Sequence, residues 1–241
     1  MTDSAQGVRD VSMPADARRT ARIVGWLFIA TFITAIVGLL LYDPVLNDSD
    51  YIIGAGDDAR VSVGALLEVL LIVTNIGTAI FLFPILKHQS ESLALGYVAS
   101  RVAEGVFIGV GIISVMSIVT LREDFAGVAG ADTASLLVTG EALVAIKDWT
   151  FVLGPGFCVA VGNGMLLGYL MYRSGLVPRG MAMLGLIGGP LIFVASTAVL
   201  FGAFEAGDPA HFLLSIPEIA WEASLGVYLI VKGFRPSPIL D

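Results

Sequence analysis

Six long apolar stretches occupy most of this chain and constrain its fold more than any other feature. The hydrocarbon core of a bilayer is about 30 Å thick, so a helix rising about 1.5 Å per residue needs about 20 apolar residues to cross it. The stretches reach this length and run over residues 23–42, 61–86, 93–120, 142–172, 181–204 and 212–231. They predict an all-α fold, a polytopic transmembrane helical bundle with six spans.

The composition supports this prediction and indicates a single membrane domain. Hydrophobic residues make up 56% of the chain and charged residues 14%, and the mean hydropathy is +0.88. We expect a polar N-terminal tail over 1–22, a six-helix domain over 23–231 and a C-terminal tail over 232–241. The first stretch is longer than a signal-peptide core, and we expect it to remain as a membrane anchor.

The connections between the stretches predict the topology, because lysine and arginine gather on one side. Alternate connections carry nine basic residues, namely Arg9, Arg18, Arg19, Arg22, Lys87, Arg173, Arg179, Lys232 and Arg235, whereas the others carry Arg60 and Arg122. By the positive-inside rule both termini face the cytoplasm of a cell with this protein in its plasma membrane. The opposite loops are acidic, and they form either a solvated surface or a rim that concentrates cations.

Seven ionisable residues lie inside the apolar stretches, where a charge costs a few kcal/mol or more unless it is paired, hydrated or neutralised. They are Glu68, Arg101, Glu104, Lys147, Asp148, Glu218 and Glu222. With five acids against two bases, full ionisation would leave three surplus negative charges. We therefore expect some of the acids to be protonated, to bind a cation or to line a hydrated cavity.

Helical spacing places several of these side chains on shared faces. Arg101 and Glu104 are three residues apart and Glu218 and Glu222 are four apart, so each pair shares one face of its helix. Likewise, Glu68 shares a face with Asn75, which is two turns further along the helix. The neighbours Lys147 and Asp148 point about 100° apart, so we expect each to contact a different partner.

Two hypotheses about function remain open from this pattern. In the first, the buried carboxylates form a pathway or site for protons, a cation or a small polar solute, as in a transport or permeation protein. In the second, the protein is a membrane binding, sensor or structural protein, and the same charges only fix helix packing. The lipid bilayer is a partner in both hypotheses.

Motifs for other kinds of chemistry are missing from the sequence. Both histidines, His88 and His211, fall in connections between the predicted spans, and Cys158 has no second cysteine, so no metal or haem site is expected. Phosphate-binding, dinucleotide-binding, zinc-protease and serine-nucleophile motifs are also absent, which disfavours an enzyme without excluding one. We predict no cofactor and no nucleic-acid partner.

Three segments resemble a family of membrane proteins. They read SRVAEG over 100–105, GYLMYRSGLVPR over 168–179, and PE, E and LIVKG within 217–233. This pattern is similar to that of domain-of-unknown-function family 4386, over roughly residues 20–235. The resemblance implies a prokaryotic six-helix integral membrane protein and draws attention to Arg101, Glu104, Arg173, Pro178 and Glu218, but it implies no activity or substrate.

The turn after the fourth stretch has a simple physical interpretation. Gly175 is suited to the positive φ that ends a helix, and Pro178 is suited to begin the next one. Arg173 and Arg179 flank this turn at the predicted cytoplasmic surface, where we expect them to contact lipid phosphates.

Overall fold

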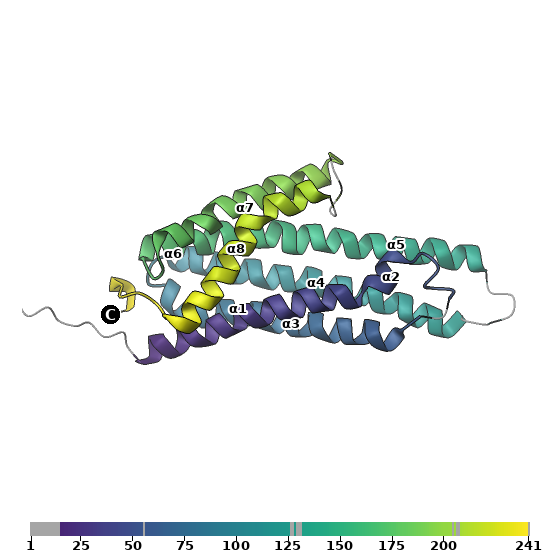
Figure 1. Ribbon diagram of the computed structural model, residues 1–241, viewed down its shortest axis with the longest axis horizontal. Coiled ribbons are helices and arrows are strands. Elements are labelled where there is room, and N and C mark those ends of the chain that lie inside the picture. The colour runs from purple at the N-terminus through teal and green to yellow at the C-terminus, as the bar shows by residue number, and fades with distance from the viewer. Residues whose placement is uncertain are drawn as a thin grey trace, which may run out of the picture.

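The computed structural model describes residues 15–54, 56–125, 128, 132–203, 205 and 208–240, and within them the chain is helical with connecting turns and no strands. The long elements are α1 (Ala15–Leu41), α3 (Asp58–Leu86), α4 (Glu91–Phe125), α5 (Thr133–Phe151), α7 (Arg179–Leu200) and α8 (Pro209–Val231). Shorter ones are α2 (Asp43–Asn47), η1 (Val152–Cys158), η2 (Ala160–Leu167), α6 (Gly168–Ser174) and η3 (Pro238–Leu240). Figure 1 shows them as one elongated bundle.

Six helices in the described residues are long and apolar enough to cross a membrane, which confirms the predicted spans. The fourth is longer than predicted, because α5, η1, η2 and α6 form 42 continuous helical residues from Thr133 to Ser174. Its start lies before the predicted residue 142 because hydropathy marks only the apolar part of a helix. Residues 1–14, which include Arg9, as well as Phe204 and Asp241, lie outside the described residues.

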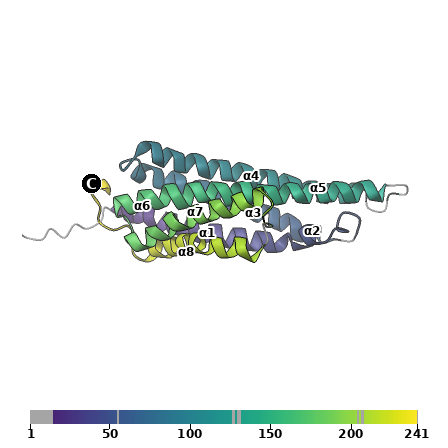
Figure 2. The ribbon, with the colours of Figure 1, turned by 90° about the horizontal axis from the view of Figure 1, so that it is seen from above.

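The helices are arranged with both described chain ends at one end of the bundle, as an even number of crossings requires (Figure 1). We call this the inner end and the opposite one the outer end. Helix α3 packs between α1 and α4, α5 packs on α4, and α8 packs on both α7 and α1. At the outer end, α4 and α5 extend well beyond α7 and α8 in both views (Figures 1 and 2).

The middle of the fourth span is wound as a π-helix over η1 and η2, where backbone hydrogen bonds run from residue i to i+5. Pro155 lies inside η1, and the chain continues through it as a wider helix. Two carbonyl groups of the π-wound segment accept bonds from other helices. Ser100 Oγ donates to the Cys158 carbonyl at 2.7 Å and Trp221 Nε1 donates to the Asn163 carbonyl at 3.1 Å.

Glycines let α7 pack so closely on η2 and α8 that backbone atoms of neighbouring helices are in contact. A Cβ atom on Gly164 would lie 2.3 Å from the Cα of Gly189, and one on Gly188 would lie 2.5 Å from the backbone nitrogen of Glu218. Neither space can hold a methyl group, so a larger residue would force the helices apart. The glycines of the GxxxG spacings at 164–168 and 185–189 therefore serve packing within the bundle.

The loop after α1 is held against the outer ends of α3 and α4 by Arg122. Its guanidinium pairs with Asp58, donates from Nε to the Gly54 carbonyl at 2.9 Å, and lies 5.4 Å from the ring centroid of Tyr51. The Tyr51 hydroxyl donates to Asp58 Oδ1 at 2.6 Å. Burial and the neighbouring Asp58 carboxylate raise the pKa of Tyr51 above its ordinary value.

The C-terminal segment folds back onto the inner end of the bundle. The Arg235 backbone N–H donates to the Leu176 carbonyl at 2.7 Å, and Ser237 Oγ donates to the Ser174 carbonyl at 2.6 Å. Phe234 is only 2% exposed and belongs to the hydrophobic core at this end. The segment therefore covers the turn between α6 and α7, and Gly175 in that turn has the predicted positive φ, at 69°.

Candidate functional site

Arg101 lies at the centre of a polar cluster inside the bundle. Its side chain is 1% exposed, and its Nη1 donates to Glu104 Oε2 at 2.5 Å, one turn further along α4. Its Nη2 lies 3.6 Å from Glu222 Oε1 of α8, and the ring of Tyr97 lies 6.0 Å from the guanidinium carbon. One buried cation thus faces two carboxyl groups from different helices.

The cluster continues from Glu104 across two further helices. Asn75 of α3 donates from Nδ2 to Glu104 Oε1 at 2.9 Å, and Thr31 of α1 donates to Asn75 Oδ1 at 3.3 Å. Asn75 is fully buried, so these bonds satisfy an amide that has no access to water. The chain of contacts links α4, α3 and α1 near the middle of their lengths.

On the side of Arg101 away from Glu104, Glu222 is hydrogen-bonded to Asn163 of the π-wound segment. Asn163 Nδ2 donates to Glu222 Oε1, and the Asn163 carbonyl accepts from Trp221. We did not single out Asn163 from the sequence. The available signal was its amide within an apolar, glycine-rich stretch, because a buried amide requires hydrogen-bond partners.

Glu218 is the least satisfied member of the cluster. It is 1% exposed, and neither of its carboxyl oxygens has a hydrogen-bond partner among the described residues. Its Oε2 lies 2.8 Å from the position of a Cβ on Gly188 and 2.9 Å from that of a Cβ on Gly164. The carboxyl group thus contacts the backbone of α7 and η2 at glycine positions. A negative charge there would be strongly disfavoured, because no donor in the described part of the chain compensates it.

Unsatisfied donors and acceptors occur elsewhere in the same cluster. Arg101 Nε and Nη2 and Asn163 Oδ1 are buried without a hydrogen-bond partner among the described residues. Buried polar atoms in folded proteins are nearly always hydrogen-bonded, and exceptions often mark functional positions. The cluster therefore contains two donor nitrogens and one acceptor oxygen that make no hydrogen bond to the described residues.

Glu68 and Lys147 form a separate ion pair nearer the outer end. Lys147 Nζ donates to Glu68 Oε1 at 2.5 Å and lies 5.0 Å from the ring centroid of Tyr42. Both charged residues are buried. Glu68 lies seven residues from Asn75, about 10 Å along the helix axis, so this pair is distinct from the Arg101 cluster.

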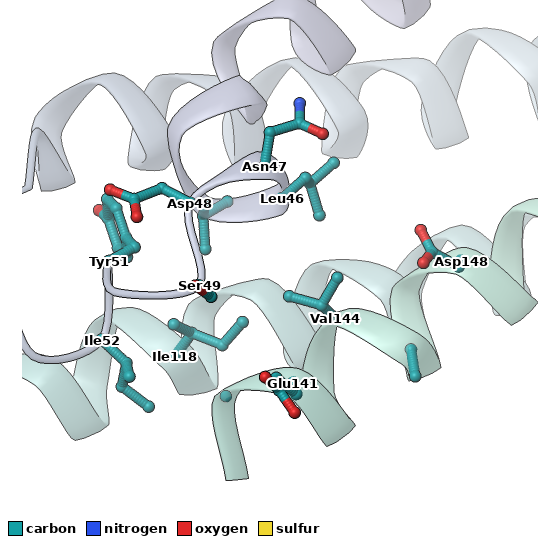
Figure 3. A pocket seen from close by; sticks show the side chains of 13 residues that line it. Leu46, Asn47, Asp48, Ser49, Tyr51, Ile52, Ile118, Glu141, Val144 and Asp148 are labelled. Atoms are coloured by element: carbon teal, nitrogen blue, oxygen red, sulfur yellow. The ribbon is translucent and has the colours of Figure 1, made fainter. Parts of the chain in front are cut away.

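Asp148 faces neither cluster and instead lines a pocket at the outer end (Figure 3). The pocket has a volume of about 340 Å³ and lies between α5 and the loop that follows α2. Asp48 and Glu141 also contribute carboxylates, and Figure 3 shows the three acidic groups spread around it. In the described part of the chain, no group of three or more His, Cys, Asp or Glu side chains is placed to hold a metal ion.

The two predicted lipid contacts lie at the inner end. Arg173 is exposed in the last turn of α6, and Arg179 begins α7 with its guanidinium carbon 5.5 Å from the ring centroid of Tyr172. The structure therefore brings together Arg101, Glu104 and Asn75 with Glu222, and places Glu218 one turn from Glu222 on α8. It keeps Glu68, Lys147, Asp148, Arg173 and Arg179 apart from them.

Six membrane-spanning helices around a buried polar cluster define a polytopic helical membrane protein. The chain belongs to the family described as "Domain of unknown function (DUF4386)", whose model matches residues 23–233. No curated protein and no solved structure matches the chain. The family match confirms the resemblance stated from residues 100–105, 168–179 and 217–233.

Proposed function

We propose that this protein carries out proton-linked transport or permeation across the membrane, with Glu218 and Glu222 as the groups that gain and lose protons. The observation that carries the proposal is the environment of Glu218, a fully buried carboxyl group without a hydrogen-bond donor. Such a group is stable as a neutral acid and unstable as an anion. A change of protonation there would be coupled to a change of helix packing.

The charges of the cluster support this proposal. Arg101 faces Glu104 at 2.5 Å and Glu222 at 3.6 Å, and Glu218 lies one turn from Glu222. Three ionised carboxylates against one guanidinium would leave two negative charges in a low-dielectric interior. Protons remove this surplus without needing further ligands, whereas a metal cation requires several oxygen atoms around it.

The arrangement along α8 also suits proton exchange. Residues four apart on a helix have Cβ atoms about 5–6 Å apart, so Glu218 and Glu222 can exchange a proton directly or through one water molecule. Glu222 lies ten residues before Lys232, about 15 Å from the inner end of the helix. That depth is near the middle of a hydrocarbon core about 30 Å thick.

The hypothesis of a purely structural role for these charges rests on other members of the cluster. Glu104 bonds both Arg101 and Asn75, and Asn75 bonds Thr31, so these contacts fix the relative positions of α4, α3 and α1. Under that hypothesis, a neutral substitute at Glu218 leaves every function of the protein intact. The proposal therefore divides the cluster into two parts. The contacts around Glu104 hold the helices in place, and Glu218 and Glu222 on α8 gain and lose protons.

The test is proton flux into liposomes that contain the purified protein and a pH-sensitive dye, with the potential set by potassium and valinomycin. We expect wild-type flux above that of empty liposomes and loss of that flux in Glu218→Gln and Glu222→Gln. Glu141→Gln is the matched control, because Glu141 is exposed in the outer pocket. A sodium gradient in place of the proton gradient tests a metal cation as the transported ion.

Two outcomes would overturn the proposal. One is wild-type proton flux that equals that of empty liposomes, whatever the result in the sodium gradient, and the other is undiminished proton flux in Glu218→Gln protein. Each variant is first compared with the wild type by size-exclusion profile and melting temperature, so that loss of flux is not confused with loss of fold.

A further inference from the structure

A groove lies on the exposed face of α1, near the inner end of the bundle. It shares no residue with the buried cluster around Arg101. It has a volume of about 600 Å³, and those of its lining residues that the structure describes all belong to α1. The residues that line it are Arg18, Arg19, Arg22, Ile23, Trp26, Leu27 and Ala30. Its lining changes from basic to apolar in the direction of the membrane interior.

The basic part of the groove is a compact set of three guanidinium groups. Arg18 and Arg22 are four residues apart and Arg19 and Arg22 are three apart, so all three side chains share one side of the helix. All three are exposed, and none forms a salt bridge within the part of the chain that the structure describes. Three adjacent cations repel one another unless an anion lies between them.

The position of the groove matches the layered structure of a bilayer. Arg22 directly precedes the apolar run of α1, and Arg18 lies about 6 Å closer to the inner end along the helix axis. The headgroup layer on each side of the hydrocarbon core is about 5–8 Å thick, so the arginines lie at the depth of lipid phosphates. Trp26, which is 61% exposed, lies one turn from Arg22 toward the membrane interior. Amphipathic aromatic rings are favoured at this boundary between headgroups and hydrocarbon.

We propose that this groove binds one anionic phospholipid from the leaflet at the inner end. Its phosphate lies among the three guanidinium groups, and an acyl chain runs along Ile23, Leu27 and Ala30. Guanidinium groups are suited to phosphate because they donate two parallel hydrogen bonds to its oxygens. The apolar floor favours a lipid over free phosphate, because free phosphate would leave that floor uncovered.

Arg179, the other basic position considered for lipid contact, differs from the α1 groove in its surroundings. Its guanidinium lies over the ring of Tyr172, and it has no second arginine within one turn along α7. The α1 groove combines three unpaired cations with an adjoining apolar surface. It is therefore the stronger of the two positions for a specific lipid.

The experiment counts lipids on the delipidated protein by native mass spectrometry after addition of phosphatidylglycerol or phosphatidylcholine with the same acyl chains. We expect one phosphatidylglycerol to bind at least about tenfold more tightly than phosphatidylcholine. The variant R18Q/R19Q/R22Q should bind phosphatidylglycerol roughly a hundredfold more weakly, since each basic residue near an anionic surface contributes about fivefold. Arg22→Lys keeps the charge without the paired donors and should weaken binding by a smaller factor.

The matched control removes the same charge from the same end of the bundle outside α1. It is the variant K87Q/K232Q/R235Q, in which all three replaced side chains are exposed, and we expect it to bind phosphatidylglycerol like the wild type. Equal weakening in both triple variants would overturn the proposal in favour of diffuse attraction. Equal affinity of the wild type for the two lipids, or displacement by glycerol 3-phosphate at similar concentration, would also overturn it.

Discussion

Replacing Glu104 by glutamine tests how much the buried ion pair contributes to stability. The amide has nearly the same shape but removes the charge that faces Arg101 Nη1 at 2.5 Å. Because Arg101 is 1% exposed, water cannot take the place of the lost carboxylate. Removing one partner of a buried pair costs about 3–5 kcal/mol. Glu222 remains 3.6 Å from Nη2 and keeps part of the compensation, so we expect a loss of about 3 kcal/mol.

This loss is large enough to measure by thermal unfolding. For chains of this size 1 kcal/mol shifts the melting temperature by about 2–4 °C, so Glu104→Gln should melt about 6–12 °C below the wild type. Tryptophan fluorescence in a fixed detergent is a suitable signal, because Trp221 donates to Asn163 beside the cluster. Glu141→Gln, at an exposed position, should change stability by no more than about 0.5 kcal/mol.

A double variant gives the decisive comparison. Arg101→Met combined with Glu104→Gln removes both charges, so it should lose at least about 1 kcal/mol less than the sum of the two single losses. A Glu104→Gln protein that melts within about 2 °C of the wild type would refute the reasoning. Strict additivity of the two substitutions would refute it as well.

Three further predictions concern other parts of the molecule. A hydrophobic carbodiimide adds only to a protonated carboxyl group, so we expect it to label Glu218 in the wild type, with faster labelling at lower pH and none at this position in Glu218→Gln. Alanine at Gly189, whose Cβ would lie 2.6 Å from a backbone oxygen of η2, should lower stability by about 1–3 kcal/mol, whereas alanine at Gly109, with nothing within 4 Å, should not lower it. Because the pKa of Tyr51 is raised in the folded protein, its contribution to the free energy of unfolding should be constant below about pH 10 and fall as pH rises further, since the unfolded chain loses that proton first. Tyr51→Phe should therefore flatten the alkaline fall in pH-dependent melting curves.

The sequence was sufficient to predict the spans and the faces of individual helices. Hydropathy located all six spans, and helical spacing placed Arg101 with Glu104 on one face. Both predictions depend on local periodicity, which requires no knowledge of how helices pack. The positive φ of Gly175 was predictable for the same reason, since the end of a helix is a local event.

Contacts between helices were not predictable in this way. Nothing local indicates that Glu222 approaches Arg101, or that Lys147 selects Glu68. Asn163 was missed because its part in the cluster depends on the π-wound segment, and no residue pattern identified that winding. Partner choice depends on how the helices pack, which is a property of the bundle as a whole.

The π-wound segment makes the fourth span shorter than an α-helix of the same residues would be. A helix whose hydrogen bonds span five residues is wider, and therefore shorter, than the same residues with bonds that span four. Rewinding η1 and η2 as an α-helix would lengthen the span and turn the Asn163 amide away from Glu222, to which it now donates. The pitch of one helix thus determines two things. One is how far the turn at Gly175 lies along the bundle axis, and the other is whether the Glu222 carboxyl group, near the middle of the membrane, is hydrogen-bonded by Asn163.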